Sequence, residues 1–260
     1  NYDNIADLKW SSYGGGMNFS LVPGSSPVFI EGHVNASNYT LSLEENLLQP
    51  RTSSIFGVDL GFDFTYFLKN SSEIAYGINV GGFNTNFKTF NELGRSISDE
   101  NFTIEVGAYL NYRLVKKRFV IEPGMRLQYY ATLNTFSPEP RLGVKYNASE
   151  KFRIKASGGR YSQNFTSASS DRDVVNLFNG FLSAPTNVQN TFVNQDGKTI
   201  ADIKNGLQYA WHAVFGFEVD VTKRWSLNVE GYYKDFTQLS NINMNKLYDD
   251  IDDFYQIDDV

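Results

Sequence analysis

The chain has 260 residues, which is enough for one large all-β unit or for two small domains. Its net charge of -6 at pH 7 argues against a nucleic-acid-binding surface, which needs a basic face, and the absence of cysteine excludes a disulfide framework and a thiolate metal site. No segment approaches the roughly 20 continuous apolar residues of a membrane-spanning helix. A membrane β-strand needs only about 9–11 residues, of which alternate ones are apolar, so these numbers remain compatible with a β-barrel.

Four segments, 56–66, 102–114, 119–129 and 209–221, alternate between apolar side chains and small or polar ones. In the first of them the apolar set is Phe56, Val58, Leu60, Phe62, Phe64 and Tyr66, and the other set is Gly57, Asp59, Gly61, Asp63 and Thr65. Successive side chains of a strand point to opposite faces, so each segment predicts a strand with one apolar face. Six further strands are expected near 5–21, 28–42, 73–88, 138–146, 152–164 and 225–236, which makes ten in all.

The connections between these strands alternate in length. Short turns are expected at 23–27, 69–72, 115–118, 147–151 and 222–224. The other connections are mostly longer, at 44–52, 89–100, 165–206 and 237 onward, with a shorter one at 131–137. This alternation indicates an up-and-down antiparallel sheet and is typical of transmembrane β-barrels, which have short turns on one side and longer loops on the other.

The longest connection, 165–206, is too long for a plain turn and predicts a small helix. Ser169 or Ser170 is the expected N-cap, and Pro185 ends the helix. Its expected apolar face consists of Val174, Leu177, Phe178 and Phe181. The expected extracellular-loop candidates are Asp171, Arg172 and Asp173, which face a substrate or a partner in one interpretation. We favour helix capping and loop packing for them, because Asp is preferred in a first helical turn.

We expect the apolar faces to point outward, against lipid. The alternative is a soluble β-sandwich or lipocalin-like barrel, but several expected strands have about 11 to 15 residues, whereas soluble strands have about five or six. Glycine is frequent on the polar face, and aromatic residues cluster beside the short turns, as is typical of a membrane–water boundary. These aromatic residues are Tyr66, Tyr112, Phe119, Tyr146, Phe152 and Trp225. The adjacent turns hold Lys116, Lys117, Arg118, Lys151, Lys223 and Arg224, whose long side chains reach water or headgroups.

We expect no catalytic residue, no metal site and no cofactor. The chain has two histidines, His33 and His212, whereas metal sites usually need three or four convergent ligands. It contains no G-x-S-x-G nucleophile elbow and no phosphate-binding loop. His212 alternates onto the polar face together with Glu218 and Asp220, so a barrel hydrolase is one alternative.

Charged side chains on the expected lumen face are the candidate site residues. They are Glu122, Arg126, Glu139, Arg141, Lys145, Arg153 and Lys155. In one interpretation they form a solvated wall, because barrel interiors are commonly polar. In the other they are contacts for an internal plug domain or a substrate.

Five stretches of the chain carry a resemblance to a known family. They are Phe119-Val-Ile-Glu-Pro-Gly-Met-Arg-Leu-Gln-Tyr-Tyr, Phe136-Ser-Pro-Glu-Pro-Arg-Leu-Gly-Val-Lys-Tyr, Ser170-Asp-Arg-Asp-Val-Val-Asn-Leu-Phe with Gly180-Phe-Leu, and Leu227-Asn-Val-Glu-Gly-Tyr-Tyr-Lys-Asp-Phe. Together they resemble TonB-dependent receptors of the Bacteroidetes type. The resemblance is sharpest from about residue 119 to 245.

The resemblance implies a 22-stranded barrel with a plug inside it, in the outer membrane of a Gram-negative cell. Such receptors import nutrients, here a glycan, a peptide or a metal chelate, with TonB acting through the plug, and some work with a surface lipoprotein. Residues 1–260 are then expected to be part of the barrel domain, with the plug and the barrel ends not present. Two alternatives stay open: a receptor-like barrel that serves as a structural subunit without transport, and the barrel hydrolase.

Overall fold

A computed structural model describes residues 6–45, 49–91, 93–169, 178–183, 191–193, 199–203 and 205–239. Ten of the strands in this part of the chain form one antiparallel sheet, in the order β1-β2-β3-β4-β5-β6-β7-β8-β13-β14. Each strand pairs with its neighbour in sequence except at β8, which pairs with β13 across the long connection. The sheet is therefore an up-and-down meander, as predicted.

The strands of this sheet are long. They are β1 (Ala6–Leu21), β2 (Val28–Glu45), β3 (Arg51–Phe67), β4 (Glu73–Phe90), β5 (Ser96–Lys116), β6 (Phe119–Tyr130), β7 (Thr135–Asn147), β8 (Phe152–Gln163), β13 (Gln208–Thr222) and β14 (Trp225–Gln238). A short 3-10 turn, η1 (Lys69–Ser71), joins β3 to β4. The ten predicted strands are thus confirmed, but β3 and β5 begin five and six residues before their predicted starts, at 51 and 96.

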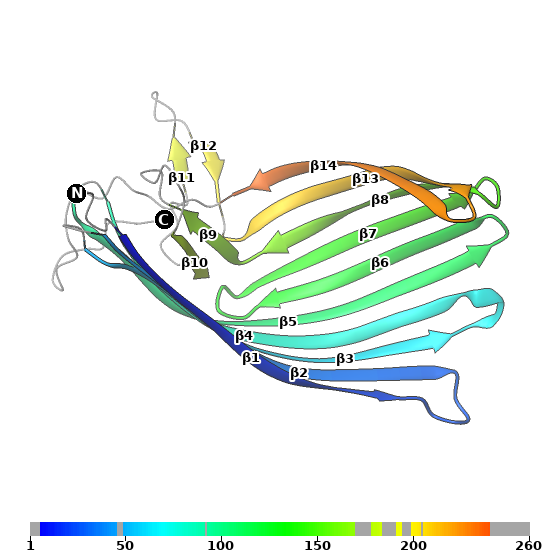
Figure 1. The fold of residues 1–260 in the computed structure, drawn as a ribbon, viewed down its shortest axis with the longest axis horizontal. Coiled ribbons are helices and arrows are strands. Elements are labelled where there is room, and N and C mark those ends of the chain that lie inside the picture. The colour runs from blue at the N-terminus through cyan, green and yellow to red at the C-terminus, as the bar shows by residue number, and fades with distance from the viewer. Residues whose placement is uncertain are drawn as a thin grey trace.

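Two small hairpins complete the described part. They consist of β9 (Phe165–Ser169) with β10 (Asn179–Ser183), and of β11 (Thr191–Val193) with β12 (Thr199–Asp202). All four strands belong to the connection between β8 and β13. They lie at the end of the large sheet opposite its short turns (Figure 1).

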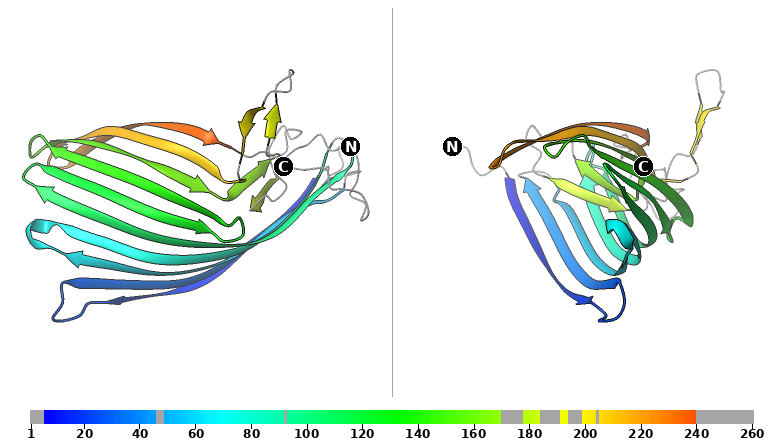
Figure 2. Two further views of the ribbon diagram at one scale, coloured as in Figure 1. Left: turned by 180° about the vertical axis from the view of Figure 1, so that it is seen from behind. Right: turned by 90° about the vertical axis from the view of Figure 1, so that its right-hand side faces the viewer.

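The large sheet curves into an open trough, with β1 and β14 as its two edges within the described residues (Figure 2). The β9–β10 hairpin lies on the concave side, and Ser53 contacts it through a hydrogen bond from the backbone amide of Phe181. Side chains alternate along β3, so Asp59 and Asp63 share this concave face with Ser53. Phe56 points to the convex face, as the sequence predicted.

The convex face is apolar and exposed over much of its length. Leu110 is 55% exposed and Phe215 is 63% exposed. The aromatic pairs Phe119–Tyr146 and Phe152–Phe217 lie beside the short turns. An apolar surface of this extent differs from that of a soluble sheet, whose apolar face is the buried one. None of the helical structure among the described residues is long and apolar enough to cross a membrane.

The main apolar cluster of buried residues lies on the concave side, where the β9–β10 hairpin covers the sheet. It contains Leu41, Leu43, Phe87, Phe178 and Leu182. The first three belong to strands β2 and β4 of the large sheet, and the last two belong to the long connection. The hairpin thus supplies the apolar cover that this part of the concave face needs.

The predicted helix in the long connection is wrong at both of its ends. Ser169 ends strand β9, and Phe181 lies in strand β10. The ring of Phe181 stacks on Phe165 across the hairpin, at 5.2 Å between centroids, and this cross-strand contact outweighs the helical spacing of the apolar residues. Residues 170–177, with Asp171, Arg172 and Asp173, lie outside the described residues, as does Pro185.

Candidate binding site on the concave face

Near the short turns, the charges of the concave face form a network across β7, β8 and β13. Arg153 lies opposite Glu218 in the register of β8 and β13 and binds it at 2.5 Å. Its second terminal nitrogen binds Asp220 at 2.6 Å. Lys155 approaches the other oxygen of Glu218 at 3.1 Å, and Lys145 lies 3.9 Å from it. The carboxylate of Glu218 therefore interacts with three basic side chains.

Two other carboxylates of the concave face, Glu122 and Glu139, have partners outside this network. Glu122 accepts an ion pair from Nε of Arg113 at 3.1 Å. Glu139, which is 3% exposed, pairs with Arg141 at 2.7 Å and accepts hydrogen bonds from the amide and hydroxyl of Ser162 at 2.8 and 2.7 Å. The buried carboxylate is thus held by one charge and two neutral donors, which offsets the cost of removing it from water.

Arg126 has a different environment, because its partners are neutral. Its Nε donates to Gln128 at 3.0 Å, and a terminal nitrogen donates to Asn79 at 3.3 Å. The amide of Gln128 in turn donates to Glu105 at 3.2 Å. Arg126 is therefore linked to a carboxylate only through an intervening amide.

All seven charged residues predicted on the lumen face lie on the concave face, and each has a polar partner within the sheet. The wall thus neutralises much of this charge by itself, with contacts such as Arg153–Glu218 and Glu139–Arg141. A separate plug is not needed to balance these charges. Their contact with a plug or a substrate stays a prediction.

A cavity of about 420 Å³ opens between this wall and the base of the β9–β10 hairpin. Three of the predicted residues, Arg126, Glu139 and Arg141, line it. The other lining residues are Ile55, Phe83, Glu105, Gln128, Tyr130, Tyr161, Ser162, Gln163, Asn164 and Phe165. The cavity therefore combines two carboxylates and two guanidinium groups with aromatic rings, so its lining offers both polar and apolar contacts.

Sequence reasoning missed most of the lining residues. Glu105 was assigned to the polar face of its strand, but nothing in the sequence places it near Glu139, which lies two strands away. Phe83 and Phe165 meet edge to face at 5.9 Å only because the hairpin folds back over β4. Such a long-range contact leaves no periodic signal in the sequence.

Buried hydroxyl groups anchor the hairpin to the wall. The hydroxyl of Ser183 lies 2.7 Å from that of Thr85 and accepts a hydrogen bond from Thr103 at 3.2 Å. The side-chain amide of Asn101 donates to the carbonyl oxygen of Ser183 at 2.9 Å. A polar anchor of this kind is geometrically specific, because each buried hydroxyl needs its partner. The base of the hairpin, and with it one side of the cavity, has a defined position.

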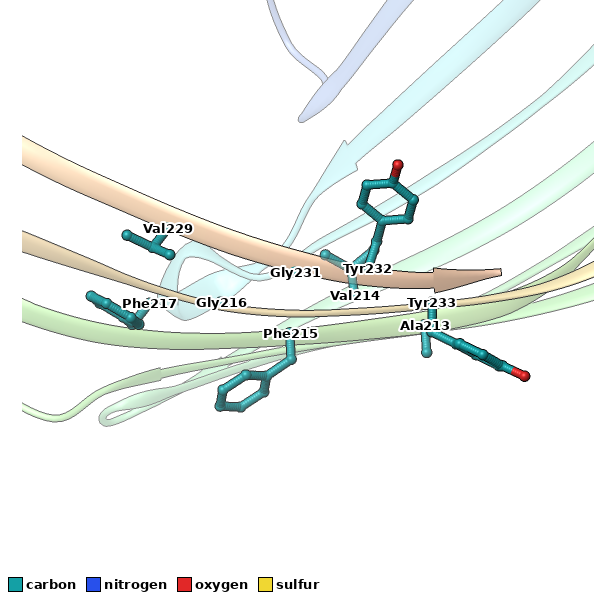
Figure 3. Close-up of a pocket in the computed structure, with 9 residues that line it drawn as sticks. All are labelled: Ala213, Val214, Phe215, Gly216, Phe217, Val229, Gly231, Tyr232 and Tyr233. Atoms are coloured by element: carbon teal, nitrogen blue, oxygen red, sulfur yellow. The ribbon is translucent and has the colours of Figure 1, made fainter. Parts of the chain in front are cut away.

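A second depression, of about 510 Å³, lies on β13 and β14 and is apolar (Figure 3). Phe215 and Tyr233 project to one side of the sheet there, and Tyr232 projects to the other (Figure 3). Gly231 lies opposite Phe215 in the register, and its missing side chain leaves the hollow. This depression has no charged lining residue, so we do not include it in the site.

Neither histidine lines the cavity, although His212 contacts one of its lining residues, Tyr161. Nε2 of His33 is 2.6 Å from a carboxylate oxygen of Asp59. The His212 ring stacks on Tyr161 at 4.5 Å. Within the described ranges, no serine hydroxyl hydrogen-bonds to either histidine, and no group of three potential metal ligands occurs.

No family model and no curated protein matches the chain in sequence. Solved structures match it in fold. The chain superposes on a mutant of the ferric enterobactin receptor PfeA from Pseudomonas aeruginosa with a TM-score of 0.58 and 9% identity, over 89% of this chain and 35% of that one. It has the fold of a TonB-dependent receptor barrel.

Two further structures support the same fold. The siderophore receptor PirA from Acinetobacter baumannii gives a TM-score of 0.52 and 9% identity, over 89% of this chain and 35% of that one. The outer membrane transporter YddB from Escherichia coli gives 0.51 and 11%, over 84% of this chain and 33% of that one. The chain thus spans about a third of the length of the receptors and the transporter that it matches. Its ten-stranded meander corresponds to part of their 22-stranded barrels and is not closed within the described residues.

Proposed function

We propose that this chain is a part of the barrel wall of an outer-membrane receptor that takes up a nutrient in a TonB-dependent manner. The observation that carries the proposal is the receptor-barrel fold together with a membrane-sized apolar band on the convex face. In β5 the outward set runs from Phe102 to Leu114, roughly 40 Å of strand at about 3.3 Å per residue. A tilt of about 45° reduces this to roughly 28 Å, close to the apolar band of about 25 Å in transmembrane barrels.

In this proposal the protein lies in the outer membrane of a Gram-negative cell, and lipid covers the convex face. Residues 1–260 form part of the barrel domain of a larger receptor, consistent with their coverage of about a third of the matched structures. A plug lies against the concave face and reaches TonB. A surface lipoprotein is a further proposed partner, on the basis of the sequence resemblance alone.

We assign different roles to the two ends of the concave face. The cavity residues Arg126, Glu139 and Arg141 lie toward the long connections, the end at which a substrate arrives in a barrel of this kind. We propose that they contact the substrate. The remaining four residues lie closer to the short turns, where we propose that they contact the plug. These four are Glu122, Lys145, Arg153 and Lys155.

Growth of a deletion strain tests the function. We expect a strain without the native protein to grow more slowly when one nutrient class is limiting, among ferric siderophores, oligopeptides and glycans supplied one at a time. Uptake of that nutrient, labelled and measured in cells, should require TonB. Growth that is unaffected with every class, and a membrane complex that is lost with the protein, would favour the structural-subunit alternative.

An Arg126→Met variant tests the assignment of the cavity. Because loss of a charged hydrogen bond in a site costs about 1.5–3 kcal/mol, uptake of the same labelled nutrient should fall about tenfold or more. Lys88→Met is the matched control, since Lys88 is an exposed lysine of β4 on the convex face. Equal uptake by the two variants, with equal amounts of protein in the membrane, would show that Arg126 is not part of the site. That result would leave the proposed transport function unaffected.

A further inference from the structure

Three neighbouring turns at the short-turn end carry six exposed basic residues, which we call the basic rim. They are Lys116, Lys117, Arg118, Lys151, Lys223 and Arg224. They occupy the β5–β6, β7–β8 and β13–β14 turns or the strand ends beside them, where the only carboxylate is Glu150. Within the described part of the chain none of the six is ion-paired with a carboxylate.

The basic rim therefore differs from the concave face, where basic side chains such as Arg153 and Arg141 pair with carboxylates. It also differs from the other two short turns, 22–27 and 68–72, which hold a single basic residue, Lys69. Neighbouring strands lie about 4.8 Å apart, so adjacent turns are about 10 Å apart and the basic rim spans about 20 Å. Arg118 donates a hydrogen bond to the carbonyl oxygen of Ala148 at 3.3 Å, but no carboxylate of the described residues balances the positive charge of the basic rim.

Aromatic side chains fix the level of the basic rim relative to a membrane. The rings of Phe119 and Tyr146 lie 4.7 Å apart beside the first two turns, and Trp225, directly after the third, is 74% exposed. Aromatic rings at the ends of barrel strands lie at the headgroup level. The basic residues lie within one to five positions of these rings, in the turns or at the strand ends beside them, so they lie among or just beyond the headgroups.

The backbone at Lys117 adds an independent observation. Lys117 has a φ of 55°, in the left-handed region that suits glycine, asparagine or aspartate. The equivalent turn between β3 and β4 has Asn70 at a φ of 61°, a residue that tolerates this conformation. Lysine suits this conformation less well than asparagine, so the turn itself does not require a lysine at this position.

We propose that the basic rim binds the phosphate headgroups of anionic phospholipids, such as phosphatidylglycerol, in the membrane leaflet next to the short turns. Ammonium and guanidinium groups bind phosphate oxygens through charge-assisted hydrogen bonds, and a basic segment at a membrane surface attracts anionic lipid. This inference rests on the membrane placement in the proposed function. It adds to that proposal a preference for anionic lipid and assigns this preference to the three turns of the basic rim.

The test places the native protein in bilayer discs made of equal amounts of phosphatidylglycerol and phosphatidylethanolamine. The lipids retained after extraction are counted by native mass spectrometry. The double variant Lys151→Gln with Lys223→Gln is compared with Lys69→Gln with Lys88→Gln, which removes the same charge elsewhere. We expect the retained ratio of phosphatidylglycerol to phosphatidylethanolamine to fall by up to about fivefold for each rim lysine removed, and to stay unchanged in the control. High salt should lower the wild-type ratio, because it screens exposed charges.

Lys117→Asn separates lipid binding from turn stability. Asparagine suits the left-handed backbone, so this variant should be at least as stable as the wild type to denaturant and yet retain less phosphatidylglycerol. Unchanged retention in both the double variant and Lys117→Asn would overturn the inference. So would a co-purifying protein that is lost from the double variant while its lipid ratio is unchanged, which would assign the rim to an acidic protein.

The same experiment distinguishes failure of this inference from failure of the proposed function. A native protein that enters the discs but shows no preference for phosphatidylglycerol overturns only the lipid assignment. A native protein that does not enter lipid bilayers overturns the membrane placement, and the lipid assignment with it.

Discussion

The half of the sheet next to the short turns and the half next to the long connections have opposite polarity on their two faces. In the turn half, Leu110 and its outward neighbours make the convex face apolar, and ion pairs such as Arg153–Glu218 line the concave face. In the loop half, Leu43 and Phe87 are buried on the concave face, whereas Asn86 is exposed on the convex one. The apolar face is therefore the covered face in each half. In the loop half the β9–β10 hairpin covers the concave face, and in the turn half, in our proposal, lipid covers the convex face.

Strand β4 contains the change of polarity within one continuous element. Its large apolar residues occupy even positions from Ile74 to Val80 and then odd positions, Phe83 and Phe87, before the terminal residue Phe90, with Gly81 and Gly82 between the two sets. Because side chains alternate between faces, this shift by one position moves the apolar set from the convex face to the concave face without bending or ending the strand. The position of the shift thus marks where the apolar band ends.

The largest expected effect comes from the covered part of the loop half. Phe87→Ala should cost about 3–5 kcal/mol, because Phe87 is 2% exposed and its ring lies against Phe178 of the long connection. We expect this free energy to be lost from the packing of the hairpin against the sheet. Proteolysis within residues 165–206 should therefore become much faster. The control is Phe136→Ala, which removes an exposed ring of β7 outside this cluster and should leave that rate nearly unchanged.

Next in size is a charge placed on the apolar band. Leu110→Arg should lower the free energy of unfolding in lipid vesicles by about 2–4 kcal/mol, the cost of a basic residue near the middle of a bilayer. Asn86→Arg places the same side chain on the convex face of the loop half and should cost little. If denaturant titrations in vesicles give the two variants equal losses, the two halves do not differ in their contact with lipid.

A smaller effect is expected at the polar anchor of the hairpin. Ser183→Ala removes the shared partner of the Thr85 and Thr103 hydroxyl groups, and an unsatisfied buried hydroxyl costs about 1–3 kcal/mol. Hydrogen exchange of the Phe181 amide, which is bonded to Ser53, should report this loss. The exposed Ser98→Ala should not change it, and protection that survives in Ser183→Ala would show that the apolar contacts alone hold the hairpin.

The smallest effect is expected on the concave face of the turn half. Lys155→Met should change the free energy of unfolding by less than about 1 kcal/mol, because the side chain of Lys155 is 33% exposed and Arg153 keeps its contact with Glu218. Denaturant titration of the two proteins side by side gives the difference. A cost close to that of Leu110→Arg would mean that this face is far less hydrated than its exposure indicates.

The sequence predicted best where the alternation keeps one phase. Segment 209–221 was predicted within one residue of β13 at each end, and the ten-strand order follows from the lengths of the connections. Prediction was weaker at the loop ends of β3 and β5, where the outward positions become polar and the apolar pattern stops. It failed at the β9–β10 hairpin, because the spacing from Phe178 to Phe181 fits a helix as well as it fits a strand beside a turn.

By itself, the sequence determined the meander, the apolar band and the set of charged residues on the opposite face. All three follow from side chains alternating along a strand, which is a local property of the backbone. Only the tertiary structure decided that the long connection folds back over the concave face, that Glu105 and Glu139 line one cavity, and that the wall pairs most of its own charges. These features depend on which strands are neighbours and on the sheet's curvature, and both are set by contacts between residues far apart in the chain.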